Sequence, residues 1–220
     1  MLHVARRVRD FGLADRLVIA TDAREIATVV ERGGFEAVLT SPAHQSGTER
    51  VAEVAGRNEF RGFDLVLNVQ GDEPFVARAA VRGTVERLRA GDPIGTAAGT
   101  LDPAEAHDPG RVKVVIGVTG HAVYFSRAPI PFNRDGTGGV GYRQHVGVYG
   151  YTRAALERWV RLPPVPHERW ERLEQLRPLL HGVPIGVAVF DEAPAPGIDT
   201  PADLRWAERR LSRELREVSP

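Results

Sequence analysis

Residues 64–74 read Asp64-Leu65-Val66-Leu67-Asn68-Val69-Gln70-Gly71-Asp72-Glu73-Pro74, an apolar run that ends in a Gly and two acidic residues. The run predicts a strand over 65–69, and a Gly after a strand lets the chain turn away from the sheet. Open α/β sheets bind nucleotides in the crevice at the carboxyl ends of their strands. The stretch therefore predicts an acidic strand tip at such a crevice, where a hard cation would sit. A plain strand followed by an acidic turn is the alternative.

Short apolar runs and amphipathic stretches alternate along the rest of the chain. Strands are expected over 16–20, 37–40, 65–69, 94–101, 112–118, 122–125, 145–151 and 185–190, and helices over 1–9, 22–32, 46–57, 76–90, 154–161, 167–180 and 201–217. Asp22 and Ser46 are expected to cap the helices that follow them. The alternation predicts an α/β fold with a mixed, mainly parallel sheet, helices on both faces and an inserted antiparallel lobe.

The composition limits the class of protein. The 29 basic and 29 acidic residues give a net charge of zero, so no broad positive surface for nucleic acid or for an anionic membrane is expected. Cys is absent, which excludes disulfides and Cys-based metal sites or nucleophiles and fits a reducing compartment. No apolar run approaches the roughly 20 residues of a membrane helix, and no signal-peptide segment opens the chain. We therefore expect a single cytoplasmic domain over 1–220.

Residues 44–50, HQSGTER, lie between an expected strand and an expected helix. Backbone N–H groups point outward at the start of a helix, so this segment could grip a base edge or a phosphate. The candidates for this contact are His44, Gln45, Ser46, Gly47 and Thr48. A capping box made by Ser46 and Glu49 is the alternative, and both can hold at once.

Asp199 lies in Gly197-Ile198-Asp199-Thr200, just before the last expected helix. If the sheet brings this loop beside the strand tip at Asp72, the two carboxylates could share a Mg²⁺. Such an ion typically takes one or two carboxylates plus substrate phosphates. The alternative is that Asp199 helps to cap the final helix.

Four further residues could contact a ligand. His145 and Tyr149 lie four residues apart in an expected strand and therefore share one face. Glu174 and Gln175 are adjacent on an expected helix, so at most one of them should point squarely at a common target. A lone strand His or helical Glu is more often structural, so these residues gain meaning only within the whole pattern.

The segment 129–139 is dense in Pro and Gly and should form a mobile loop. Its glycines lack the strand and helix of a dinucleotide-binding turn, so we interpret them as flexibility and not as a phosphate cradle. Arg127 and Arg134 flank this loop and could hold a substrate carboxylate through paired hydrogen bonds. Solvation of both side chains is the equal alternative.

Seven segments carry a resemblance to a known family. In chain order they are HQSGTER (44–50), NVQGDEP (68–74), VKVV (112–115), YFSR (124–127), HVGVYGY (145–151), EQLR (174–177) and GIDTP (197–201). Together they closely resemble the 3-deoxy-manno-octulosonate cytidylyltransferases, over essentially the whole chain. The resemblance implies a Rossmann-like nucleotidyltransferase sheet. It also implies transfer of CMP from CTP to an acidic eight-carbon sugar, with release of pyrophosphate, for lipopolysaccharide biosynthesis.

The resemblance implies a role for each candidate. Asp72 and Asp199 would bind the catalytic Mg²⁺, and residues 44–48 together with Asp72 would bind the nucleotide. The sugar pocket would consist of Gln70, Arg134, His145, Tyr149, Glu174 and Gln175, with Arg127 as a second choice. The resemblance also implies a homodimer, with residues 112–180 as the sugar-binding and dimerisation lobe, and no nucleic-acid or membrane partner.

The chain departs from the family at its start. The family begins with a strand and a basic loop that holds the triphosphate, whereas Met1 aligns inside the helix that follows. We expect a gap in the sheet with unpaired backbone groups, and poor or absent CTP turnover by the 220-residue chain. A longer reading frame, a fragment, or an inactive nucleotide- or sugar-binding remnant would each explain the departure. A cytidylyl- or uridylyltransferase for another sugar is the alternative activity.

Overall fold

The computed structural model describes residues 1–136 and 139–218, with side chains up to Arg213. Its helices are α1 (Leu2–Phe11), α2 (Arg24–Arg32), α3 (Gly47–Gly56), α4 (Arg78–Arg89), α5 (Arg153–Arg161), α6 (Pro166–Glu171), α7 (Leu176–Leu180) and α8 (Pro201–Val218), with short 3-10 turns η1 (Asn58–Phe60) and η2 (Pro103–Glu105). Its strands are β1 (Val18–Thr21), β2 (Glu36–Leu39), β3 (Leu65–Val69), β4 (Ile94–Thr100), β5 (Lys113–Ile116), β6 (Ala122–Ser126), β7 (Arg143–Thr152) and β8 (Ile185–Val189).

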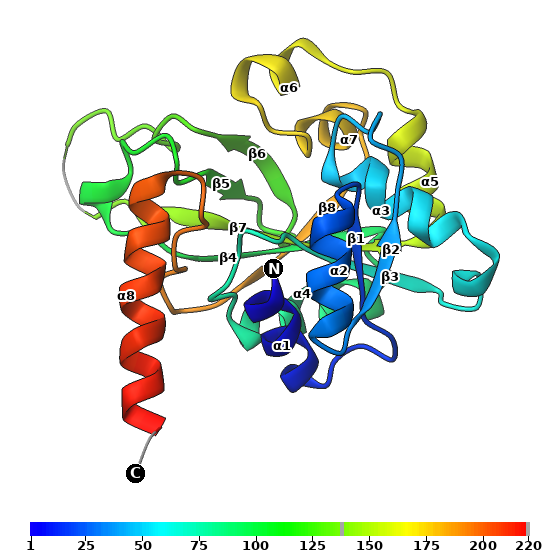
Figure 1. The fold of residues 1–220 in the computed structure, drawn as a ribbon. Helices are drawn as coiled ribbons and strands as arrows, with labels where there is room; N and C mark the ends of the chain where they lie inside the picture. The colour runs from blue at the N-terminus through cyan, green and yellow to red at the C-terminus, as the bar shows by residue number, and fades with distance from the viewer. Residues whose placement is uncertain (137–138, 219–220) are drawn as a thin grey trace.

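β7 is the central strand of a six-stranded sheet (Figure 1). One edge of β7 pairs with β4, and the other edge pairs with β5 near residue 144 and with β3 over 148–152. β6 pairs with β5, and β8 pairs with β4. It follows that β3, β4, β5 and β8 point one way and β6 and β7 the other. The predicted α/β class with a mixed, mainly parallel sheet is confirmed.

β1 and β2 form a separate parallel pair. Among the described strands, β1 pairs with β2 alone and β3 pairs with β7 alone, so no backbone ladder joins β1 to β3. The sheet is therefore interrupted, as the sequence led us to expect. α3 contacts both β1 and β3 and so bridges the interruption from one side.

Local sequence explains the start of α3, whereas two other expectations about the helices are wrong. Ser46 caps α3 by accepting a hydrogen bond from Glu49 N, as predicted. Asp22 does not cap α2, because Ala23 is the N-cap residue and the Asp22 carboxylate instead pairs with Arg50 at 3.0 Å. The single helix expected over 167–180 is two helices, α6 and α7, because the chain adopts the left-handed conformation at Arg172 (φ 51°).

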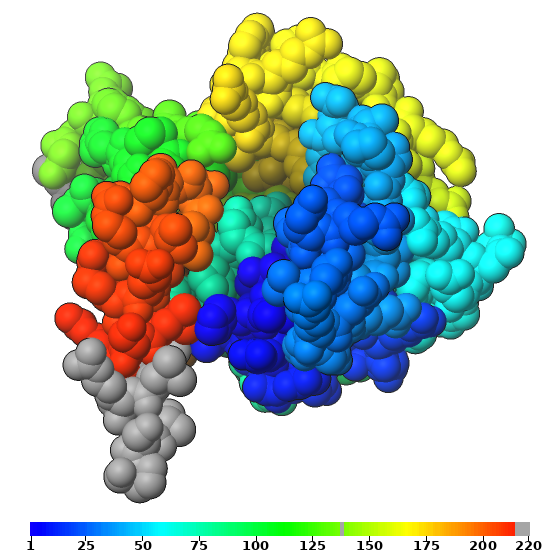
Figure 2. Space-filling view, viewed as in Figure 1, coloured from blue at the N-terminus to red at the C-terminus, as the bar shows by residue number. Residues whose placement is uncertain are grey.

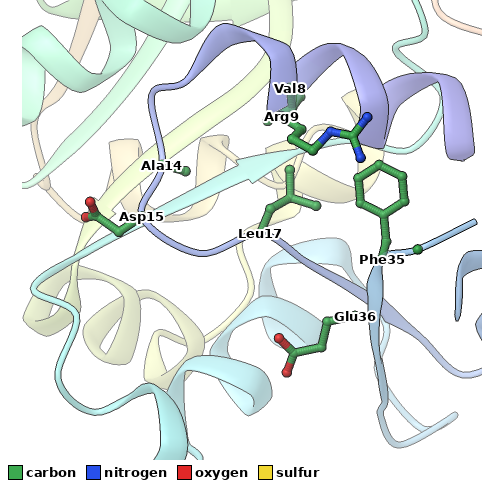
Figure 3. A pocket seen from close by; sticks show the side chains of 8 residues that line it. Val8, Arg9, Ala14, Asp15, Leu17, Phe35 and Glu36 are labelled. Atoms are coloured by element: carbon green, nitrogen blue, oxygen red, sulfur yellow. The ribbon is translucent and has the colours of Figure 1, made fainter.

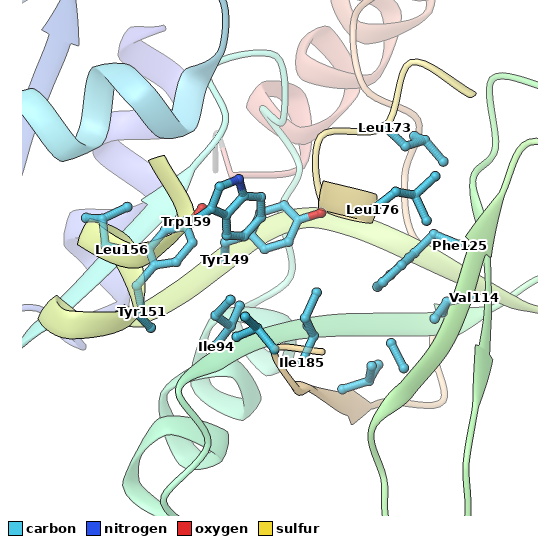
Figure 4. Packing of buried hydrophobic residues seen from close by; sticks show 14 of the residues in the cluster. Ile94, Val114, Phe125, Tyr149, Tyr151, Leu156, Trp159, Leu173, Leu176 and Ile185 are labelled. Carbon is cyan, nitrogen blue, oxygen red and sulfur yellow. The ribbon is translucent and has the colours of Figure 1, made fainter. Parts of the chain in front are cut away.

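Two buried clusters lie on opposite faces of the large sheet, since alternate residues of a strand point to opposite sides. Tyr149 and Tyr151 of β7 join the first cluster, where their rings meet the Trp159 ring of α5 at centroid distances of 5.9 and 5.6 Å (Figure 4). Val146 and Val148 join the second cluster, which α4 covers. Helices thus cover both faces of the sheet.

α8 stands at one edge of the molecule, and its C-terminal end extends away from the sheet (Figure 1). It is attached through Trp206, whose ring meets the Phe75 ring edge-on at 5.3 Å, and through Arg210, which lies 4.4 Å above the Phe75 ring. Phe75 follows the acidic loop of β3, so this contact anchors α8 beside that loop. None of the described helices has the length and apolar character needed to cross a membrane.

The Pro- and Gly-rich segment between β6 and β7 has no helix or strand in its described part. Residues 137–138 of the predicted loop lie outside the described residues. The placement of strands β4 to β7 around this loop agrees with the expected runs over 94–101, 112–118, 122–125 and 145–151 to within a few residues. The role of residues 112–180, which include this loop, as a sugar-binding and dimerisation lobe stays a prediction.

Candidate active site

The loop that follows β3 is fixed to a bulge in β7. The ladder between β4 and β7 is interrupted at residues 147–148 of β7. At this bulge Gly147 O accepts a hydrogen bond from Gln70 N at 3.2 Å, and Gly147 N donates to Glu73 Oε1 at 3.2 Å. Bulges are common beside functional sites, where they redirect a strand. This bulge holds the acidic loop against the centre of the sheet.

The structure brings Asp72 and Asp199 side by side. The loop before α8 lies against the loop after β3, because Ile198 N donates to Asp72 O at 2.9 Å. Burial raises the pKa of Asp72, and the nearby charge of Asp199 raises it further. The Oδ1 atom of Asp72 is buried with no hydrogen-bond partner among the described residues, whereas Asp199 is exposed. Their role in holding a cation stays a prediction.

The alternative role of Asp199 as a helix cap is wrong. Thr200 Oγ1 accepts a hydrogen bond from Asp203 N at 3.2 Å, and Asp203 Oδ2 accepts one from Thr200 N at 2.8 Å. These two residues therefore cap α8 between them. The carboxylate of Asp199 takes no part in the cap.

Glu73 is a third carboxyl group in the same loop, and the sequence pattern assigned it no role of its own. Burial raises the pKa of Glu73 to about 7, and the charge of Asp72 contributes. Its Oε1 receives the Gly147 N–H, so the side chain connects the acidic loop to β7. Its position next to Asp72 in the sequence was the only available signal, because the burial of both side chains depends on the fold.

Glu174 joins the candidate nucleotide segment to the candidate sugar pocket. Burial raises the pKa of Glu174, although Ser46 and Thr48 hydrogen-bond to its carboxylate and oppose the rise. Thr48 is fully buried, and its Oγ1 lies 3.3 Å from Tyr151 Oη. The start of α3, the segment before α7, and β7 therefore meet in one buried polar cluster.

Three buried polar atoms in this region have no hydrogen-bond partner in the described part of the chain. They are Tyr149 Oη and Glu174 Oε2 in the cluster and Asp72 Oδ1 in the loop after β3. Asn68 and Tyr149 are opposite each other in the pairing of β3 with β7, and the charge of Glu174 helps to raise the pKa of Tyr149, after burial. Buried polar groups are nearly always paired, and an unpaired one costs about 1–3 kcal/mol. The cluster therefore fits a polar ligand.

The side chains of the nucleotide segment are partly held by their own neighbours. His44 Nε2 lies 2.7 Å from Glu53 Oε2 of α3, and Gln45 Nε2 donates to Ala43 O at 3.2 Å. Gly47 is exposed at the first turn of α3. The segment thus offers a ligand the backbone at a helix start, with the His44 ring fixed beside it.

The sugar-pocket candidates differ in burial and in position. His145, Tyr149 and Gln175 lie inside the fold, whereas Arg134 lies on an exposed loop. The rings of His145 and Tyr149 lie 5.3 Å apart, so the strand places both on one face as expected. Gln175 is buried, with 3% of its surface exposed. Arg134 is exposed on the loop between β6 and β7, and no contact among the described residues ties it to the others.

Arg127 is a structural link between β6 and α6. Its guanidinium donates to Pro109 O and Glu171 O, each at 2.7 Å. The Glu171 carboxylate accepts in turn from Arg127 N at 2.9 Å and from Ser126 Oγ at 2.6 Å. Arg127 is therefore neither simply solvated nor a free carboxylate receptor.

A hollow is visible on the face of the molecule shown in Figure 2. It is bordered by α8, by the segment that carries α6 and α7, and by the N-terminal third of the chain (Figure 2). Its floor includes the part coloured between cyan and green, where β3 leads through the acidic loop to α4. The hollow thus opens toward the carboxyl end of β3.

A separate pocket of about 280 Å³ lies at the amino-terminal ends of β1 and β2. Leu17 and Phe35, which precede these two strands, line it together with Arg9, whose guanidinium carbon lies 4.8 Å from the centre of the Phe35 ring (Figure 3). Nucleotide crevices in α/β sheets occur at the carboxyl ends of strands. We therefore do not assign this pocket to the candidate site.

Comparison with known proteins identifies the family. The family model described as cytidylyltransferase matches residues 1–185. A 3-deoxy-manno-octulosonate cytidylyltransferase from Gemmatimonas aurantiaca is 50% identical over 209 residues, which cover 93% of this chain and 81% of that protein. The chain belongs to the 3-deoxy-manno-octulosonate cytidylyltransferase family. Another member, from Methylococcus capsulatus, is 46% identical over 221 residues, covering 96% of this chain and 86% of its own.

Solved structures agree with this cytidylyltransferase fold. A CMP:2-keto-3-deoxy-manno-octonic acid synthetase complexed with CTP superposes with a TM-score of 0.88 at 34% identity, covering 96% of this chain and 87% of that one. A putative glucose-1-phosphate thymidylyltransferase from Bacillus anthracis gives a TM-score of 0.61 at 14% identity, covering 94% and 80%, and shows the shared fold alone. The predicted family, fold and enzyme class, a nucleotidyltransferase, are confirmed.

The carboxylates of this cytidylyltransferase fit a hard divalent cation. Asp72 Oδ1 is buried and unpartnered, and the repulsion from Asp199 that raises its pKa would be relieved by a bound cation. Among the described residues no group of three or more His, Asp or Glu side chains could hold a metal ion. A Mg²⁺ here would therefore complete its shell with substrate phosphates and water, as Mg²⁺ commonly does.

His145 should make this cytidylyltransferase less stable in mild acid. Burial lowers the pKa of His145 to about 3, whereas a His in an unfolded chain has a pKa of about 6.5. Below that value the unfolded chain binds a proton that the folded chain does not, so stability falls as pH falls. Between pH 7 and pH 5 the free energy of unfolding should fall by about 2 kcal/mol because of His145.

Chemical denaturation at pH 7 and pH 5 measures this loss. The His145→Gln variant should lose about 2 kcal/mol less than the wild type over that interval. His107→Gln, at an exposed position, is the matched control and should keep the pH dependence of the wild type. An equal loss in the wild type and in His145→Gln would contradict the expectation.

Proposed function

We propose that the chain transfers CMP from CTP to 3-deoxy-manno-octulosonate and releases pyrophosphate, a step of lipopolysaccharide biosynthesis. The relatives at 46–50% identity carry this activity in their names, and the synthetase that superposes at a TM-score of 0.88 is complexed with CTP, which fits the same reaction. The observation that carries the proposal is the set of unpartnered buried polar atoms, with Tyr149 Oη and Glu174 Oε2 in the polar cluster and Asp72 Oδ1 in the loop after β3.

In this proposal the protein acts mainly by positioning and by electrostatics. A hydroxyl of the sugar attacks the α-phosphate of CTP, the bond from that phosphate to pyrophosphate breaks, and the hydroxyl proton is released. Asp72 and Asp199 would hold a Mg²⁺, which when bound spreads the negative charge that develops on the phosphates. Without a cation, the burial and the mutual repulsion that raise the pKa of Asp72 oppose its charged form.

The nucleotide and the sugar would meet across Glu174. Residues 44–48 would recognise the cytidine through the backbone at the start of α3. His145 and Tyr149 would face the sugar from β7, with Gln70 and Gln175 beside them and Arg134 approaching from the exposed loop. The Glu174 carboxylate hydrogen-bonds to Ser46 and Thr48, and its charge helps to raise the pKa of Tyr149. Glu174 therefore lies between the residues proposed to bind the nucleotide and those proposed to bind the sugar.

Pyrophosphate release tests the proposed reaction, with the protein expressed from its complete reading frame. With CTP and Mg²⁺, release should require 3-deoxy-manno-octulosonate. UTP in place of CTP, a nine-carbon acidic sugar and a hexose 1-phosphate should each give less than about a tenth of that rate, since lost polar pairing weakens binding strongly. Faster release with another sugar or with UTP would assign a different transferase. Tight binding of CTP and of the sugar without release would assign a binding protein.

A homodimer and a cytoplasmic location complete the proposal. Val118 and Val123 of the β5–β6 hairpin and Val189 of β8 are exposed apolar side chains that a second copy of the chain could cover. Sedimentation velocity should give twice the monomer mass of 24.1 kDa. A monomer at micromolar concentration would contradict the dimer.

A further inference from the structure

Thr96 lies beneath the candidate sugar site and was not singled out by any sequence pattern. It is fully buried in β4, beside the bulge at residues 147–148 of β7. Its Oγ1 lies 2.8 Å from Val148 O and 3.0 Å from His145 Nε2. One hydroxyl thus makes two hydrogen bonds of good length, both to β7.

The position of the proton in each bond follows from what each atom can do. Val148 O can only accept, so the single hydroxyl proton of Thr96 must lie toward it. If Thr96 donated to His145 instead, Thr96 Oγ1 and Val148 O would lie 2.8 Å apart with no proton between them. Thr96 therefore accepts from His145, and Nε2 of His145 carries the ring proton.

A neutral imidazole has one N–H and one bare nitrogen, so proton placement at Nε2 leaves Nδ1 as an acceptor. The ring is neutral at physiological pH, because burial lowers its pKa to about 3. Phe125 and Tyr149 flank the ring at centroid distances of 5.1 and 5.3 Å and restrict its rotation. No residue in the described part of the chain hydrogen-bonds to Nδ1.

We propose that Thr96 is a positioning residue of the sugar site, which holds His145 in the Nε2–H tautomer so that Nδ1 accepts a hydrogen bond from a sugar hydroxyl. The sugar contact rests on the proposed function, whereas the tautomer does not. An acceptor nitrogen repels a carboxylate and attracts an O–H. His145 would therefore select a hydroxyl of the acidic sugar, and the sugar carboxylate must lie elsewhere in the pocket.

Nitrogen NMR of ¹⁵N-His protein at pH 7 tests the tautomer directly. The signals of His145, one of seven His residues, are assigned by their absence in His145→Gln. Two-bond correlations to the ring protons distinguish a protonated Nε2 from a bare one. The proposal predicts a protonated Nε2 and a bare Nδ1 in the wild type and in Thr96→Ser, and loss of this single state in Thr96→Val. A protonated Nδ1 in the wild type would overturn it.

Kinetics on the same variants test the sugar contact. In Thr96→Val the KM for the sugar should rise about tenfold, because the Nε2–H loses its acceptor and the tautomer is no longer fixed. The KM for CTP should change less than about twofold, and Thr96→Ser should restore the wild-type sugar KM. Thr84→Val is the matched control, since Thr84 is equally buried but its hydroxyl donates only to Ala80 O of its own helix.

The outcomes separate the two claims. An unchanged sugar KM in Thr96→Val, or an equal rise in Thr84→Val, would overturn the positioning role. A wild-type protein that binds no octulosonate, but shows the Nε2–H tautomer, would contradict the proposed function and keep the assignment of the ring proton. Rescue by Thr96→Ser with both readouts restored would support the whole proposal.

Discussion

Replacing Asp72 by Asn is expected to lower kcat for pyrophosphate release about a thousandfold, which corresponds to ~4 kcal/mol of lost transition-state stabilisation. Asn keeps the shape of the side chain but removes the charge that would hold the cation. The Oδ1 atom of Asp72 is buried and has no protein partner among the described residues, so no neighbour compensates for the loss. Steady-state kinetics at saturating CTP, Mg²⁺ and sugar measure the effect.

The same substitution should not destabilise the fold. Burial raises the pKa of Asp72, which means that the folded protein opposes the charged form. Thermal unfolding in a chelator should therefore show Asp72→Asn to be at least as stable as the wild type. Asp10→Asn, on the exposed end of α1, is the matched control and should leave both kcat and stability unchanged. Activity of Asp72→Asn within a few-fold of the wild type would exclude Asp72 as a metal-holding residue.

Replacing Trp159 by Ala is expected to cost about 3–5 kcal/mol of unfolding free energy. The Trp159 side chain is 1% exposed and its ring packs edge-on against Tyr149 and Tyr151 (Figure 4). Truncation leaves a cavity behind two tyrosines of the candidate site, so sugar binding should weaken as well. Urea denaturation measures the loss, and the melting temperature should fall by about 6–20 °C.

Trp170 offers a matched control for this substitution. Its side chain is 76% exposed on α6, so Trp170→Ala should change the unfolding free energy by less than about 0.5 kcal/mol. The comparison removes the general effect of losing an indole ring. Equal losses in Trp159→Ala and Trp170→Ala would show that the cluster around β7 does not carry the stability assigned to it.

The element order and the positions of the two acidic loops could be predicted from the sequence, because both depend on local signals. The apolar run before Gly71 marks a strand end, and the Thr200-Pro201 pair marks a helix start that the structure places at Pro201. Such signals locate the loops at Asp72 and Asp199. The resemblance of the motifs then supplied the pairing of the two loops, which the bond from Ile198 N to Asp72 O establishes.

Features that depend on contacts between distant segments could not be predicted. Asp22 has every property of a helix cap, yet Arg50 of α3 provides its carboxylate with a stronger partner. Arg172 ends a helix in the left-handed conformation, and no Gly or Asn at that position indicates this in the sequence. Thr96 lies in an apolar strand, and only the bulge at 147–148 places it beneath His145.

Asp72 and Asp199 should hold one divalent cation beside bound CTP. Crystals grown with CTP and Mn²⁺, which replaces Mg²⁺ at oxygen sites, test it through anomalous diffraction. One anomalous peak is expected within bonding distance of both carboxylates and of a triphosphate oxygen. Mn²⁺ on the triphosphate with both carboxylates unliganded, or CTP bound away from the carboxyl end of β3, would contradict it.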